Sequence, residues 1–242
     1  MGKIGLFDLE KHFAFYGAYH SNPVNIFIHM VFVWPILFTF LMLLHFTPPL
    51  FSLSQFGLGN NTVIVFNYGF LFTLVYALFY VLFDKKAGSV AALLCFACWL
   101  VSSSLGNYLG YSLAWKCPSF NLIGYIALDN YSAMGVEHVA VLFLVFKVVL
   151  AAQLICWTGQ FLGHGLFEKR APALLDNLAQ AFLMAPFFVL LEVGFASFLT
   201  NLKNALQMLF NYEPYPGFHL NVKARVEANI KEWQEKKQKK IS

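Results

Sequence analysis

Charged residues are scarce in this sequence. Only 12% of its 242 residues are Asp, Glu, Lys or Arg, whereas 59% are hydrophobic and 18% are aromatic. A soluble domain is usually about 25% charged and roughly 45–50% apolar. The excess of apolar residues is too large for a soluble core, so the composition predicts a polytopic membrane protein. The net charge of +4 comes mostly from the C-terminal tail and gives no reason to expect nucleic-acid binding.

Cysteine and signal-peptide features are also sparse. Four cysteines do not make a disulfide framework, and the CxxC formed by Cys95 and Cys98 lies in an apolar run, where cysteine usually behaves as a small hydrophobic residue. Asp8 and Glu10 interrupt the N-terminal segment, and no short apolar stretch there ends in a small-residue cleavage site. We therefore do not expect a cleavable signal.

Long uncharged stretches predict the helices that cross the membrane. A span needs about 20 apolar residues, and this condition is met at 24–46, 62–83, 87–106 and about 148–167. Ser21 or Asn22 can cap the first of these helices, with Pro23 in its first turn. The sequence thus predicts an all-α, polytopic membrane helix bundle with about four transmembrane helices.

Two further segments are predicted to lie at the membrane surface. Residues 4–20 mix aromatic and charged side chains, which suits an interfacial helix. Residues 177–200 are apolar but contain Pro186 and Glu192, and lipid tolerates neither an open backbone nor an unpaired carboxylate. We expect this segment to be re-entrant or interfacial.

The distribution of lysine and arginine predicts the orientation. The N-terminal segment, the 84–86 loop and the 168–176 loop carry these residues, whereas the 47–61 loop has none. Because cytoplasmic loops are enriched in Lys and Arg, both termini are expected in the cytosol. We expect one membrane-embedded domain at 1–200 and a basic cytosolic tail at 201–242, with a solvated helix over 221–240.

The tail ends in Lys239-Lys240-Ile241-Ser242. This ending resembles the cytosolic dilysine retrieval signal of endoplasmic-reticulum membrane proteins. It predicts a multi-pass protein of that membrane which binds the retrieval machinery.

Three histidines from distant parts of the chain fall at one membrane depth. His20, His29 and His164 all lie at the predicted cytosolic end of the bilayer, whereas His12 is expected on an exposed surface. Polar residues at membrane depth are costly and suggest function, and imidazole suits iron, zinc or copper. Hydrogen bonding between helices would also explain a polar residue such as His29 without any metal.

Other polar residues accompany these histidines. Gln160, His164 and Glu168 have the i, i+4, i+8 spacing of one helical stripe, and Asn25 shares a face with the histidine four residues later. Glu192 either pairs with Lys169 or Arg170 or orients a metal ligand, and the sequence leaves both possibilities open.

Two blocks of sequence resemble a known family. They read FYGAYHSNPVNIFIH at 15–29 and GQFLGHGLFEKRAPALLDNLAQAFLMAPFFVLLE at 159–192. They are similar to the signature blocks of the endoplasmic-reticulum 2-hydroxy fatty acid dioxygenases, which act in α-oxidation during the degradation of sphingoid long-chain bases. The resemblance implies an Fe(II)-dependent enzyme that uses dioxygen to shorten a 2-hydroxy fatty acid by its carboxyl carbon.

The resemblance also implies roles for individual residues. The family's histidine positions fall on His20, His29 and His164, which would hold Fe(2+), while Ser21 stands where the family often has another histidine. We select Asn25, Glu168 and Arg170 as candidate catalytic residues. Of these, Glu168 can complete the iron ligands, and either Arg170 or Lys169 can neutralise the substrate carboxylate.

Two alternatives belong to other functional classes. A channel or transporter would line a polar path with Asn25, His29, Lys147 and Glu192, but the chain lacks the matching broken helices in two halves that transporters often show. A non-catalytic membrane scaffold would bind partners through its basic tail.

Overall fold

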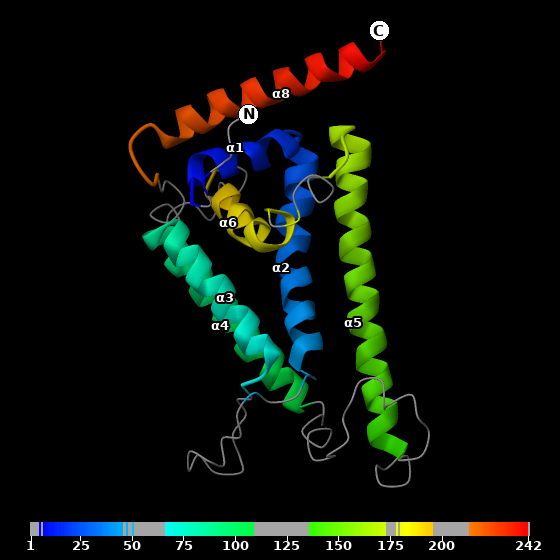
Figure 1. Ribbon diagram of the computed structural model, residues 1–242. Coiled ribbons are helices and arrows are strands. Elements are labelled where there is room, and N and C mark those ends of the chain that lie inside the picture. The colour runs from blue at the N-terminus through cyan, green and yellow to red at the C-terminus, as the bar shows by residue number, and fades with distance from the viewer. Residues whose placement is uncertain are drawn as a thin grey trace, which may run out of the picture. The chain divides into compact units, whose positions relative to one another are not determined.

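The computed structural model (Figure 1) describes residues 5, 7–45, 47, 50, 66–108, 136–172, 178, 180–195 and 213–241. Its helices are α1 (Leu9–Tyr19), α2 (Pro23–His45), α3 (Tyr68–Phe83), α4 (Lys85–Tyr108), α5 (Val136–Leu162), α6 (Ala185–Phe195) and α8 (Phe218–Ile241). Two short π-helices, η5 (Gly163–Glu168) and η7 (Gln180–Met184), follow α5 and precede α6. The predicted all-α class is confirmed.

Within the part of the chain that the structure describes, three helical stretches are long and apolar enough to cross a membrane. They are Pro23–His45, Lys85–Gly106 and Phe146–Glu168, and they correspond to three of the predicted spans. The fourth predicted span, 62–83, is described as helix from Tyr68 to Phe83, and its residues 62–65 lie outside the described part. Within the predicted interfacial segment 177–200, the described part includes a short apolar helical stretch, Phe182–Glu192. The helical membrane bundle expected from the sequence is confirmed.

Short polar side chains cap the N-termini of three helices. Asn22 Oδ1 accepts a hydrogen bond of 2.9 Å from the Val24 amide, so α2 starts at the predicted place with Pro23 in its first turn. Asp8 caps α1 by accepting from the Lys11 amide at 3.1 Å. Asp84 caps α4 by accepting from the Ala87 amide at 2.7 Å.

The chain divides into two compact units. One contains residues 1–34, 78–91 and 157–242, and the other contains 35–77 and 92–156. Every candidate site residue belongs to the first unit. In the second unit, Gln153 Nε2 donates to the Ile36 carbonyl at 2.9 Å and to Thr39 Oγ1 at 2.7 Å. The predicted division at residue 200 stays a prediction.

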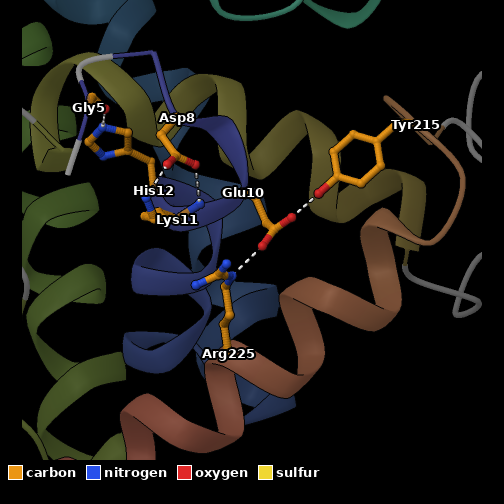
Figure 2. A network of polar contacts seen from close by, with 7 residues as sticks. All are labelled: Gly5, Asp8, Glu10, Lys11, His12, Tyr215 and Arg225. Atoms are coloured by element: carbon orange, nitrogen blue, oxygen red, sulfur yellow. Dashed lines mark hydrogen bonds and ion pairs between the residues drawn. The ribbon is translucent and has the colours of Figure 1, made fainter. Parts of the chain in front are cut away.

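The tail helix α8 packs along α1 within the first unit (Figure 1). Phe218 of α8 is fully buried, and its ring stacks on Phe13 with centroids 6.1 Å apart. Figure 2 shows the carboxylate of Glu10 between the Tyr215 hydroxyl and the Arg225 guanidinium, and it is hydrogen-bonded to both. The helix expected over 221–240 is present, and one of its faces is covered by α1.

The expectation that His12 is exposed is wrong. Its side chain is buried, and its Nε2 lies 3.0 Å from the Gly5 carbonyl oxygen (Figure 2). The ring also packs against Phe83 at the end of α3, with centroids 5.6 Å apart. A neighbouring helix end therefore covers a position that looks like surface on the helix alone.

Candidate metal centre

Three histidines meet in the first unit. His20 caps the C-terminus of α1, His29 lies in the second turn of α2, and His164 belongs to the π-helix η5. Their ring centroids are 4.3, 4.8 and 4.9 Å apart, and one nitrogen of each lies within 4.8 Å of the other two. All three side chains are buried. The structure thus brings together the three residues selected from the sequence.

Backbone carbonyls fix two of the imidazoles. His20 Nδ1 lies 2.8 Å from the Tyr16 carbonyl oxygen, and His29 Nδ1 lies 2.9 Å from that of Asn25. A carbonyl only accepts hydrogen bonds, so each Nδ1 carries the hydrogen and each Nε2 keeps a free lone pair. This tautomer is the one that a metal bound at Nε2 requires.

Buried nitrogens without partners support a metal at this position. Among the described residues, His20 Nε2 and His164 Nδ1 have no hydrogen-bond partner. Leaving one buried polar atom unsatisfied costs about 1–3 kcal/mol. A divalent cation bound between the rings would satisfy such lone pairs, so the donor set fits a metal.

The environment of His20 keeps it neutral. Burial lowers the pKa of His20 well below its ordinary value, and the neighbouring His29 and His164 lower it further. An imidazole must be neutral to bind a metal. This ring is therefore ready to act as a ligand at physiological pH.

Two glycines allow the helices that carry His29 and His164 to approach closely. A Cβ atom on Gly159 would lie 2.5 Å from Phe32 Cε2, and one on Gly163 would lie 2.3 Å from Asn25 Oδ1. This G-x-x-x-G spacing is the small-residue pattern by which membrane helices pack at short distance. The pattern is visible in the sequence at 159–163, and our sequence reasoning did not use it.

The end of this helix departs from α-helical spacing. From Gly163 to Glu168 the chain forms a π-helix, a feature that is frequent at functional sites. Lys169 ends it in a left-handed conformation with φ of 51°. The predicted α-helical stripe is therefore wrong for its last step, from His164 to Glu168, which lies within the π-helix.

Glu168 joins the end of η5 to the start of α2. Its carboxylate accepts hydrogen bonds from Ser21 Oγ at 2.8 Å, the Asn22 amide at 2.7 Å and Asn25 Nδ2 at 3.2 Å. An anion near a helix N-terminus is also favoured by the helix dipole. These contacts fix the chain between His20 and His29.

Arg170 follows Glu168 by two residues and contacts the end of α1. Its Nη1 donates to the Ala18 carbonyl at 3.0 Å, and its guanidinium carbon lies 3.5 Å above the centre of the Tyr19 ring. Trp233 of α8 lies 5.0 Å from the same carbon. The charge of Arg170 acts on His20 and contributes to its lowered pKa.

Glu192 connects α6 to the cluster. Tyr16 donates a hydrogen bond of 3.0 Å to its carboxylate, and the Tyr16 ring stacks on His20 with centroids 3.9 Å apart. Burial raises the pKa of Glu192 to about 8, with a further contribution from the charge of Glu168. Glu192 thus contacts Tyr16, and among the described residues neither Lys169 nor Arg170 nor a clustered histidine is in hydrogen-bond contact with its carboxyl group.

Comparison with known proteins identifies relatives of this chain. Residues 6–197 match the protein family described as 2-hydroxy-palmitic acid dioxygenase Mpo1-like. The chain is 32% identical over 204 residues to the Saccharomyces cerevisiae protein named 2-hydroxy-palmitic acid dioxygenase MPO1. The matched region covers 84% of this chain and 90% of the yeast protein. No solved structure matches the chain. The buried histidine cluster thus occurs in a chain that belongs to the Mpo1-like family of 2-hydroxy-palmitic acid dioxygenases.

Proposed function

We propose that this protein is an Fe(II)-dependent dioxygenase that converts 2-hydroxy long-chain fatty acids to the fatty acid one carbon shorter. One observation carries the proposal. Three buried histidines with available ring nitrogens converge in a chain of this family. A transporter or a scaffold has no need of such a cluster.

The three histidines are the residues that would hold the metal. Imidazole ligands are typical of iron in oxygenases, and iron bound there would supply the activation of dioxygen and a contact for the substrate's oxygens. The carbonyls of Tyr16 and Asn25 keep two of the rings in the required tautomer. The chain's own contribution is to hold these ligands neutral and shielded from water.

Arg170, Asn25 and Glu168 have supporting roles in this proposal. Arg170 has five N–H donors, of which Nη1 contacts Ala18, so it retains donors that can neutralise a substrate carboxylate. Asn25 is fully buried and bonded to Glu168, so both act as positioning residues that hold the start of α2.

The acyl chain of the substrate is expected to stay in lipid. Large apolar side chains such as Phe27 of α2 and Phe161 of α5 are exposed in the unit that carries the cluster. A fatty acid can therefore present its polar head to the histidines without leaving the bilayer.

We place the enzyme in the endoplasmic-reticulum membrane, with both termini in the cytosol. The distribution of Lys and Arg and the Lys239-Lys240 ending support this location. On this view the tail binds the retrieval machinery, and the reaction forms part of the degradation of sphingoid long-chain bases.

The test is iron analysis and turnover of the detergent-purified chain. Wild type should contain about one iron per chain and consume dioxygen when given 2-hydroxypalmitic acid, with the acid of 15 carbons as product. His29→Ala and His164→Ala should lose both iron and turnover, because each removes one ligand. His219→Ala is the matched control, since this histidine lies in α8 beside Glu213. Unchanged turnover in either cluster variant, or an iron-free and inactive wild type, would overturn the proposal.

A further inference from the structure

Gln160 of α5 is a buried polar residue that the proposed mechanism does not use. Its side chain is only 6% exposed, and its Nε2 has no hydrogen-bond partner among the described residues. The second glutamine of α5, Gln153, instead donates to both Ile36 and Thr39. Two glutamines of one helix thus differ sharply, and only Gln160 retains an unsatisfied donor.

The packing of α5 on α2 places Gln160 beside the histidine cluster. Gly159 lies against Phe32, and Gly163 lies against Asn25 and Ile28, so the two helices run antiparallel here. Residue 160 falls between these contacts, at the level of His29.

Gln160 follows Gly159 as His164 follows Gly163. The two side chains therefore project in nearly the same direction, one turn or about 6 Å apart along the helix. The residue with the unpartnered donor therefore lies one turn before His164 on the helix that carries this candidate ligand, whereas Arg170 follows His164 in the chain.

We propose that the Gln160 carboxamide donates a hydrogen bond to the 2-hydroxyl oxygen of the fatty acid and so selects 2-hydroxylated acids over unsubstituted ones. The inference rests on the proposed function. An unsatisfied buried donor is unfavourable, and a substrate oxygen placed there would satisfy it.

The difference in charge between Arg170 and Gln160 assigns the hydroxyl to Gln160. A carboxylate is best met by a cation, and Arg170 lies six residues after His164. Gln160 lies four residues before His164 and is neutral, so it suits the uncharged oxygen on the adjacent carbon. A site built to bond a hydroxyl also disfavours the analogue that lacks it, because its buried donor stays unpaired.

The test measures binding, not turnover. Full-length, iron-loaded protein is kept anaerobic, and the dissociation constants of 2-hydroxypalmitate and palmitate are measured by tryptophan fluorescence. The variants are Gln160→Met, which keeps the side-chain length but removes the donor, and Gln153→Met as the matched control. Iron content and thermal unfolding are recorded for each to verify the fold.

Wild type should prefer 2-hydroxypalmitate, and Gln160→Met should lose about tenfold of that preference while binding palmitate as before. Gln153→Met should keep the wild-type preference. An unchanged preference in Gln160→Met would overturn this inference and leave the proposed function intact. A wild type that prefers neither acid would overturn both.

Discussion

Replacement of Gly163 by alanine should disrupt the metal centre without touching a histidine. The added Cβ would lie 2.3 Å from Asn25 Oδ1, whereas Cβ atoms essentially never come closer than 3.0 Å. One side must therefore move by at least about 0.7 Å. Asn25 has no room to turn aside, because it is fully buried and its amide donates to Glu168 and to the Tyr19 carbonyl.

The energetic cost can be estimated from the same contacts. Overpacking a tight contact costs about 1–3 kcal/mol, and loss of one hydrogen bond of Asn25 adds about 1 kcal/mol. Alanine recovers at most about 1 kcal/mol through its higher helix propensity. Gly163→Ala should therefore destabilise the protein by about 1–3 kcal/mol.

The same displacement should weaken metal binding. His164 follows Gly163 directly, so pushing η5 away from α2 separates His164 from His29. Changes to the residues that orient metal ligands typically reduce metal affinity by about 10- to 100-fold, and a loss of that size is expected here.

Gly165 provides a matched control in the same π-helix. A Cβ atom at this position would meet nothing within 4 Å among the described residues. Gly163→Ala and Gly165→Ala should be compared by thermal unfolding and by iron affinity in competition with a chelator. Equal iron affinity in the two variants would refute the claim that close packing at Gly163 builds the site.

Three further predictions concern contacts in the same unit. Glu192 has its pKa raised to about 8 from 4.5, so the folded chain keeps a proton that the unfolded chain releases between about pH 5 and 8. The free energy of unfolding of wild type should therefore fall as pH rises through this window, and Glu192→Gln should remove this contribution. If the melting temperatures of wild type and Glu192→Gln change in parallel over pH 5–8, this prediction is contradicted. Phe218→Ala should cost about 3–5 kcal/mol, because it empties a fully buried position against Phe13. Glu10→Gln should cost at most about 1 kcal/mol, because its partner Arg225 is half exposed. Thermal unfolding of the two variants measures this difference. If Glu10→Gln is the costlier change, the view that apolar packing holds α8 on α1 is contradicted.

The sequence by itself determined the class of protein, the helices and the identity of the clustered histidines. Runs of apolar residues can be buried only in lipid or in a packed core, so they identify membrane helices without knowledge of their neighbours. Caps such as Asn22 and Asp84 are local as well, because they involve residues two or three positions apart. Membrane depth then selected His20, His29 and His164, because an imidazole in lipid is costly wherever its partners lie.

Only the tertiary structure decided which polar groups meet and which remain without a partner. Glu192 contacts Tyr16 across 176 positions of sequence, and no local pattern distinguishes that partner from Lys169 or Arg170. Gln153 and Gln160 are equivalent in sequence terms, yet packing on α2 satisfies the first and leaves Nε2 of the second without a partner among the described residues. The spacing of residues along one helix is fixed by the repeating backbone. Contacts between helices depend instead on the shapes of both helix surfaces, which meet only once the chain has folded.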